Sequence, residues 1–137
     1  MDFVFGGSKR GAVRESLGAI INQSESLSLA VSYIRMSGWK IFLDMAKHIP
    51  RDKIRIVCTE QLGVTDPDTI RDALAQKIRI RRYSGSRVFH SKLYIGHGEA
   101  NTKRFLIGSA NLSDSALNSG VEVGVSGDDS GECSNWF

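Results

Sequence analysis

Five polar side chains interrupt apolar segments in the second half of the chain, and their types suit chemistry on a phosphate group. His90 and Lys92 lie two residues apart in FHSKLYI, and Ser109, Asn111 and Glu122 follow in GSANLS and GVEVGV. A neutral imidazole can act as nucleophile, general base or general acid near pH 7. An ammonium group and a side-chain amide both donate hydrogen bonds to phosphate oxygens. A carboxylate can accept a hydrogen bond from a histidine and stabilise its charged form.

The pair His90 and Lys92 lies in a segment that is otherwise typical of a buried strand. Successive side chains of a strand point to opposite faces, so these two are expected to share one face. Burying an ammonium group without a partner is costly, so Lys92 is expected to meet water or an anion. An anion held there would lie next to His90.

Short apolar segments alternate with amphipathic ones through the first 83 residues. Helical spacing of apolar residues follows Lys9 and Ser37, and a short helix is predicted to begin at Pro67 with Asp66 as its N-cap. Strands are predicted over residues 2–5, 26–34, 53–59, 77–83, 87–96, 103–112 and 119–127. The expected fold is α/β, with a mixed, mostly parallel β-sheet flanked by helices.

Length and composition indicate one soluble domain. The 137 residues are 41% hydrophobic and 24% charged, and no apolar run reaches the roughly 20 residues that span a bilayer. The domain is expected to cover residues 1–127, and the polar residues 128–137 to be disordered or to mark the truncation of a longer chain. The first residues do not form a signal peptide. Cys58 and Cys133 lie too far apart to suggest a disulfide framework, which favours the reducing cytoplasm.

The segment QKIRIRRYSGSR concentrates positive charge in a chain whose net charge is +3. It contains five basic residues and no acidic one: Lys77, Arg79, Arg81, Arg82 and Arg87. A strand here would place Lys77, Arg79 and Arg81 on one face. Two interpretations stay open, a half-exposed strand with a solvated basic side or a surface that binds DNA phosphates beside the strand of His90.

The residues HSK at 90–92, followed by GSANLS at 108–113, resemble the HxK…GSxN signature of the phospholipase D superfamily. Glu122, on the next predicted strand, follows at a separation that resembles the one in this superfamily. The chain is also similar to members of the superfamily that carry a single motif. These include the bacterial phospholipase D-like nucleases and the nuclease domains of metal-independent restriction endonucleases. The longer motif HxKxxxxD has an aspartate where this sequence has His97. That departure weakens the case for a lipid substrate more than the case for catalysis.

The resemblance implies a phosphodiesterase mechanism without a cofactor. His90 would attack phosphorus and form a phosphohistidine, Lys92 and Asn111 would hold the non-bridging oxygens, and Ser109 would add a contact. Glu122 would orient its histidine. The sequence also lacks a cysteine cluster or paired aspartates for a metal, which favours a metal-free mechanism. Because the mechanism needs two histidines and the chain has one motif, the resemblance implies a homodimer that shares one site on its two-fold axis.

The expected function is therefore cleavage of DNA by the nuclease domain of a restriction endonuclease, with further domains in a longer parent chain. No membrane-binding segment is evident. Two alternatives stay open. A phospholipid phosphodiesterase or phosphatidyltransferase would have an apolar funnel beside the site. A non-catalytic module for nucleic-acid binding or dimerisation, within a helicase-like or defence protein, would keep the fold without activity.

Overall fold

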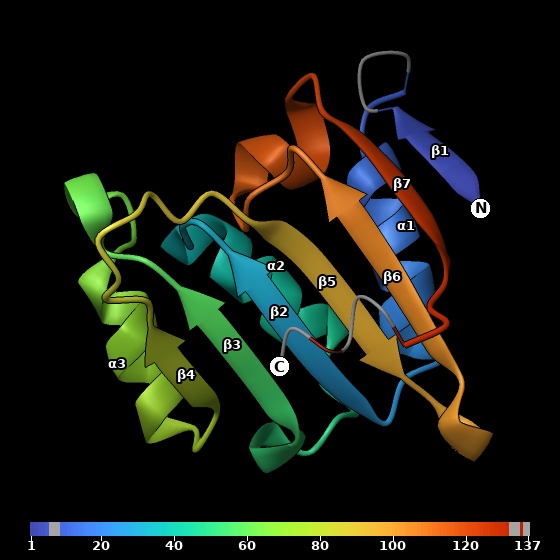
Figure 1. Cartoon of the computed structure of the whole chain (residues 1–137), viewed down its shortest axis with the longest axis horizontal. Coiled ribbons are helices and arrows are strands. Elements are labelled where there is room, and N and C mark those ends of the chain that lie inside the picture. Colours follow the sequence, from blue (N-terminus) through green and yellow to red (C-terminus); the bar gives the residue numbers. More distant parts are fainter. Residues whose placement is uncertain (6–8, 132–134, 136–137) are drawn as a thin grey trace.

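A computed structural model of the chain describes residues 1–5, 9–131 and 135. Within these residues, seven strands form one sheet in the order β1-β7-β6-β5-β2-β3-β4 (Figure 1). The strands are β1 (Asp2–Phe5), β2 (Ser26–Val31), β3 (Ile54–Cys58), β4 (Arg79–Arg82), β5 (Lys92–His97), β6 (Lys103–Gly108) and β7 (Val123–Asp128). The α-helices of the described part are α1 (Ala12–Asn22), α2 (Met36–Met45) and α3 (Pro67–Ala75).

The expected mixed sheet with flanking helices is confirmed, but the expected predominance of parallel pairing is wrong. Among the strands of the described residues, only β2 with β3 and β3 with β4 pair in parallel. The other four neighbouring pairs, from β2·β5 to β1·β7, are antiparallel. The alternation of strand and helix stops after β4. The short connection from β5 to β6 and the longer segment 109–122 from β6 to β7 then each reverse the chain direction, as antiparallel pairing requires.

The three α-helices lie on one face of the sheet, behind it in the view of Figure 1. Their apolar stripes cover the inward side chains of the strands, which include Leu29, Tyr94 and Leu106. Trp39 and Phe42 of α2 are fully buried in this core, and their ring centroids lie 5.6 Å apart. Aromatic pairs at this separation add stability beyond the burial of their area. The burial and stacking of these two rings therefore help to hold α2 under the middle of the sheet.

We call the face turned away from α1, α2 and α3 the outer face. Its apolar part contains a small cluster of Ala30, Leu93, Ile95 and Phe105. Its other half, towards β3 and β4, carries basic side chains, because Arg55 lies between the buried Ile54 and Ile56, and Arg79 and Arg81 flank the half-buried Ile80. The sheet thus has one apolar face under the helices and one face of mixed character.

Asp128 belongs to β7, and the amide of Asp129 donates a hydrogen bond to the carbonyl of Lys103 (2.9 Å). Strand pairing therefore extends one residue into the segment predicted as a tail. Residues 132–134, 136 and 137, and with them most of that prediction, lie outside the described residues. No helix among the described residues has the length and hydrophobicity needed to span a membrane.

Candidate phosphate site at the sheet edge

The strand directions bring the candidate residues to one edge of the sheet. Lys92 begins β5 and pairs with Val31 at the end of β2, because these strands are antiparallel. Gly108 ends β6 and pairs with Gly124 near the start of β7. The segments that carry His90, Ser109, Asn111 and Glu122 therefore all leave the sheet on the side where β2 ends.

His90 lies in a loop rather than in the predicted strand, which begins only at Lys92. Phe89 leaves the strand direction because its ring stacks on Tyr83 (5.1 Å between centroids) and its amide donates to Gln61 Oε1 (3.3 Å). The side chain of His90 is exposed. Its imidazole is therefore open to an incoming substrate, which a buried strand position would not allow.

Lys92 is buried, with 7% of its surface exposed, and its ammonium group is held by neutral oxygens. The Nζ atom donates to Ser32 Oγ (3.1 Å) and to the main-chain carbonyl of His90 (3.0 Å). Burial lowers the pKa of Lys92, and the nearby Glu122 carboxylate acts in the opposite direction. An ammonium group has three N–H donors. Among the described residues two are used, so one is left for an oxygen of a bound phosphate.

Asn111 is also buried, and its side-chain amide has a fixed orientation. Its Oδ1 accepts a hydrogen bond from the main-chain amide of Tyr33 (3.2 Å). This contact turns the amide NH₂ group, which carries two donors, away from the end of β2. The next residue is tied to the same segment, because Arg35 N donates to the Leu112 carbonyl (2.9 Å). The donor group of Asn111 is thus positioned before a ligand arrives.

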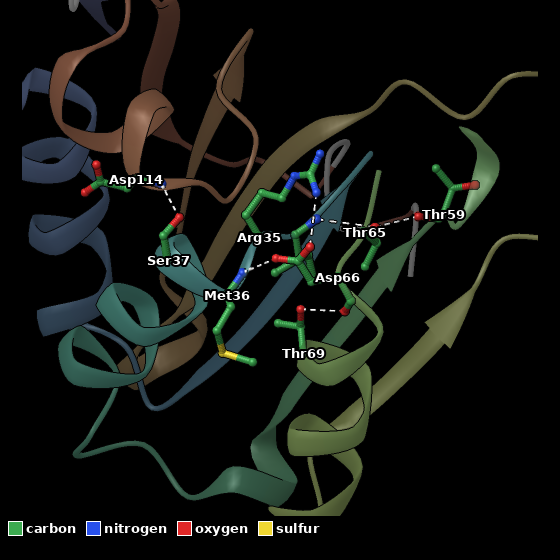
Figure 2. Close-up of polar contacts among 9 residues, drawn as sticks. Arg35, Met36, Ser37, Thr59, Thr65, Asp66, Thr69 and Asp114 are labelled. Carbon is green, nitrogen blue, oxygen red and sulfur yellow. Dashed lines mark hydrogen bonds and ion pairs between the residues drawn. The ribbon is translucent and has the colours of Figure 1, made fainter. Parts of the chain in front are cut away.

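The loop after β6 rests on α2 and on the core. The hydroxyl of the fully buried Tyr94 donates to the carbonyl of Ala110 (3.0 Å), and Asp114 N donates to Ser37 Oγ (3.2 Å, Figure 2). Gly38 of α2 lies directly under Leu112, where a Cβ atom would lie 2.5 Å from the Leu112 carbonyl oxygen. The helix can approach the loop this closely only because residue 38 has no side chain.

Ser109 and Glu122 bind each other across the ends of β6 and β7. The Ser109 hydroxyl donates to the Glu122 carboxylate, and the amide of Val123 donates to Ser109 Oγ (3.0 Å). Burial lowers the pKa of Lys92 and raises that of Tyr94; the carboxylate partly offsets the first shift and adds to the second. It therefore lies within electrostatic reach of the ammonium group. In the described part of the chain, no hydrogen bond joins Glu122 to His90, so the orienting role of Glu122 stays a prediction.

The basic segment 76–87 does not form one continuous surface. Lys77 precedes β4 in a turn with a φ of 62°, so the prediction that it shares a strand face with Arg79 is wrong. Arg82 forms an ion pair with Glu60 (2.6 Å), and Arg87 lies in the exposed loop. Arg79 and Arg81 alone point to the outer face from β4. DNA binding by these five residues stays a prediction.

One cluster that supports the site is not indicated by any local sequence pattern (Figure 2). Asp66 is at the N-cap position of α3 as predicted, but its carboxylate accepts from Met36 N at the start of α2 (2.8 Å) and pairs with Arg35 Nη1 (3.0 Å). These contacts hold the pKa of Asp66 below its usual range, the amide of Met36 being the larger cause. Thr65 links the same region, donating to Thr59 O (2.6 Å) and accepting from Ile34 N (3.4 Å). Asp66 and Met36 lie 30 residues apart in the sequence, so local patterns cannot predict this contact.

Comparison with known proteins agrees with this architecture. The family model described as "Cardiolipin synthase, PLD-like domain" matches residues 17–137. Nuc of Salmonella typhimurium, a phospholipase D family member, superposes with a TM-score of 0.69 at 18% identity, over 98% of this chain and 87% of that chain. NucT of Helicobacter pylori superposes with a TM-score of 0.73 at 15% identity, over 98% and 89%.

A larger protein contains a similar fold as a part. Yeast tyrosyl-DNA phosphodiesterase superposes with a TM-score of 0.61 at 16% identity, over 90% of this chain and 30% of that chain. At these identities the likeness to solved structures establishes the fold. No curated protein sequence matches the chain.

Proposed function

This chain belongs to the phospholipase D superfamily, through its PLD-like domain, and we propose that it is a metal-independent phosphodiesterase that cleaves DNA. The observation that carries the proposal is the buried ammonium group of Lys92, whose Nζ donates to the main-chain carbonyl of His90 at 3.0 Å. A buried cation beside an exposed imidazole is a costly arrangement for a purely structural role. It suits a site that receives an anion.

The residues have separate roles in the proposed reaction. A ring nitrogen of His90 attacks phosphorus, and the bond from phosphorus to the leaving oxygen breaks as a second histidine donates a proton to that oxygen. Water then attacks the phosphohistidine, the second histidine accepts the water proton, and the N–P bond breaks to free His90. Lys92 and Asn111 hold the non-bridging oxygens throughout. Fixed donors of this kind stabilise the charge of the transition state without reorganisation.

The second histidine is proposed to come from a second copy of the chain. His48 donates to the carbonyl of Ile21 on the helix side of the fold, and His97 ends β5 at the opposite edge of the sheet. Neither lies at the edge where His90 lies. Exposed apolar side chains surround the site, among them Val88 (81% exposed) and Val121 (80% exposed). A two-fold partner would cover these side chains and bring its own His90 to the shared site.

The same exposed side chains favour a second candidate function. Val88, Val121 and Val123 flank His90 and Glu122, and an apolar surround beside a phosphate site suits a phospholipid. In this alternative the phosphodiester of a lipid takes the place of the DNA backbone at Lys92 and Asn111. The chemistry at His90 is unchanged. Hydrolysis of phospholipid vesicles without any cleavage of DNA would decide for the lipid.

We further propose that the chain is the cytoplasmic nuclease domain of a restriction endonuclease, with sequence recognition by another domain of a longer parent chain. Its support is the resemblance of the motif region to that branch of the superfamily. A nuclease domain of this kind needs no base-specific contacts of its own, because contacts with phosphates position DNA without reading its sequence. A well-formed dimer without any phosphodiesterase activity would instead favour the binding module.

The proposal is tested by cleavage of plasmid DNA in EDTA. Wild type is expected to cleave, and His90→Ala to lose activity by at least about 10³-fold, because the nucleophile is removed. His48→Ala is the matched control and should retain activity, since this side chain lies on the helix side. Cleavage that requires Mg²⁺, or that survives the loss of His90, would refute the mechanism. A strict monomer that still cleaves DNA would refute the shared site.

A further inference from the structure

We propose that Ser32 is a positioning residue of the candidate phosphate site, and that its buried hydroxyl group holds the ammonium group of Lys92 and the main chain beside His90 in one arrangement. Ser32 follows β2 directly and belongs to neither the HSK nor the GSANLS segment. The inference rests on the proposed function, because it concerns the same site.

The register of the sheet brings Ser32 next to Lys92. Val31, the last residue of β2, pairs with Lys92, the first residue of β5, so Ser32 continues the chain just beyond the paired ends. The main chain of Ser32 is fixed from the other side, because its carbonyl accepts a hydrogen bond from the amide of Thr59 (3.1 Å), the residue after β3. Only 4% of the surface of Ser32 is exposed. Its hydroxyl group therefore has a fixed place at the edge where β2 and β3 end and β5 begins.

The hydroxyl group of Ser32 is engaged in both directions. It donates its proton to the carbonyl of Ser91 (3.2 Å), and its oxygen accepts a hydrogen bond from Lys92 Nζ (3.1 Å). A serine hydroxyl has one donor and two acceptor lone pairs, and its proton can rotate. Donation to Ser91 fixes this rotation and leaves the lone pairs for the ammonium group. Because Ser91 separates His90 from Lys92, one hydroxyl group holds the spacing between the proposed nucleophile and the proposed phosphate ligand.

A second side chain holds the segment that carries His90 between β4 and β5. Gln61 contacts its main chain at two points, because Nε2 donates to the Arg87 carbonyl (3.3 Å) and Oε1 accepts from the Phe89 amide (3.3 Å). The segment is thus held by Gln61 before His90 and by the hydroxyl group of Ser32 after it. Without that hydroxyl group, the main chain on the C-terminal side of His90 would lose this hydrogen bond.

The hydroxyl oxygen also favours the charged form of Lys92. A hydrogen bond to an ionised group is stronger than one between neutral groups, so this contact stabilises the ammonium form more than the amine. Burial acts in the opposite direction and lowers the pKa of Lys92. The titratable groups around the ammonium group are Glu122, whose charge favours the ammonium form, His90, and the tyrosines Tyr33 and Tyr94. Loss of the hydroxyl group should therefore lower the pKa of Lys92 further and leave less of it charged at alkaline pH.

Ser28 of β2 provides a matched control for Ser32. Its side chain is also buried, and its Oγ also accepts a hydrogen bond from a cationic group, Arg55 Nε (2.6 Å). It lies roughly 13 Å from Ser32 along the chain, towards the end of the sheet away from His90. Replacement of either serine by alanine removes the same atom from the same part of the chain. Of the two hydroxyl groups, only that of Ser32 contacts a residue of the candidate site.

Two measurements on the whole chain test the inference. The pKa of Lys92 is determined by NMR titration of isotope-labelled lysine side chains, with the signal assigned by its loss in Lys92→Met. Ser32→Ala is expected to lower this pKa relative to wild type, and Ser28→Ala to leave it unchanged. The second measurement is plasmid cleavage in EDTA as a function of pH. For Ser32→Ala the alkaline limb of the profile should move to lower pH, and kcat at neutral pH should fall by at least about 10-fold with little change in KM, because a displaced ligand weakens transition-state contacts.

Equal pKa values of Lys92 in wild type and Ser32→Ala would overturn the inference, and so would an equal decrease in Ser28→Ala. A lower pKa with an unchanged kcat would also overturn it. Ser32→Cys keeps the volume of the side chain but replaces its oxygen by a weakly accepting sulfur, so it should behave like Ser32→Ala. Wild-type values for Ser32→Cys would show that volume matters rather than the hydroxyl group, and would overturn the inference. An inactive wild type would refute the proposed function, and the NMR titration would then decide the inference alone.

Discussion

A single methyl group on α2 should disturb the candidate site without touching any of its residues. In Gly38→Ala the new Cβ would lie 2.5 Å from the Leu112 carbonyl oxygen, and closer still to the Leu112 carbonyl carbon and the Ser113 amide nitrogen. Carbon atoms in contact normally lie about 3.5–4.0 Å apart. All three neighbours belong to the main chain, so no side-chain rotation can relieve the clash. The loop or the helix must move by about 1 Å.

The displacement acts one residue away from Asn111. A shift of about 1 Å in a positioning group can cost about 10²-fold in rate. Overpacking costs about 1–3 kcal/mol of stability, and replacing glycine by alanine within a helix returns up to about 1 kcal/mol. We therefore expect Gly38→Ala to fold with a modest loss of stability and to lose about 10²-fold in kcat for DNA cleavage.

Gly18→Ala on α1 is the matched control. Its Cβ would meet only Met45 Sδ at 3.7 Å, which is an ordinary contact. This variant should gain about 0.5–1 kcal/mol of stability and retain full activity. The measurements are thermal unfolding and plasmid cleavage in EDTA on both variants. If Gly38→Ala cleaves at the wild-type rate, the close packing of α2 on the loop has no role in positioning Asn111.

Two further predictions concern buried titratable groups. Lys92→Met should abolish cleavage of DNA yet raise the melting temperature. Burial lowers the pKa of Lys92, so the charged form is disfavoured in the fold, and methionine carries no charge. A lower melting temperature for Lys92→Met would contradict this prediction. In the folded protein the pKa of His97 lies below its unfolded value of about 6.5. As the pH falls, the unfolded chain therefore binds a proton at this residue before the folded chain does, and wild-type stability should fall as the pH drops below about 6.5. His97→Gln should lose less stability between pH 7.5 and 5, measured by thermal unfolding, and identical losses in both proteins would contradict the assignment.

The grouping of candidate residues at one sheet edge could be expected from the sequence, because each follows or precedes an apolar strand. The detailed geometry could not. His90 was expected inside a strand, but stacking of Phe89 on Tyr83 keeps it in a loop. The hydrogen bond from the Ser109 hydroxyl to the Glu122 carboxylate was not expected either, while the contact of Ser109 with phosphate stays a prediction. Such choices between competing partners depend on tertiary positions that local patterns do not encode.

The direction of β5 shows the same limit at the level of the fold. Alternation of strands and helices up to β4 favoured parallel pairing, and nothing in the next segment specifies that β5 inserts beside β2 in the opposite direction. That insertion is what brings Lys92 to Ser32. It also carries His97 to the far edge, next to Ser28 and close to Arg55.

The departure from the motif HxKxxxxD acquires a physical meaning from this geometry. His97 follows Lys92 by five residues on one strand, so the two side chains point to opposite faces and lie roughly 17 Å apart along β5. The substitution therefore changes the charge of the outer face and leaves the groups around His90 as they are. An aspartate at this position would lie near Arg55 and Lys103, the two cations whose charges act on residue 97. The histidine found there has a lowered pKa, first because of its burial and then because of the charges of Arg55 and Lys103.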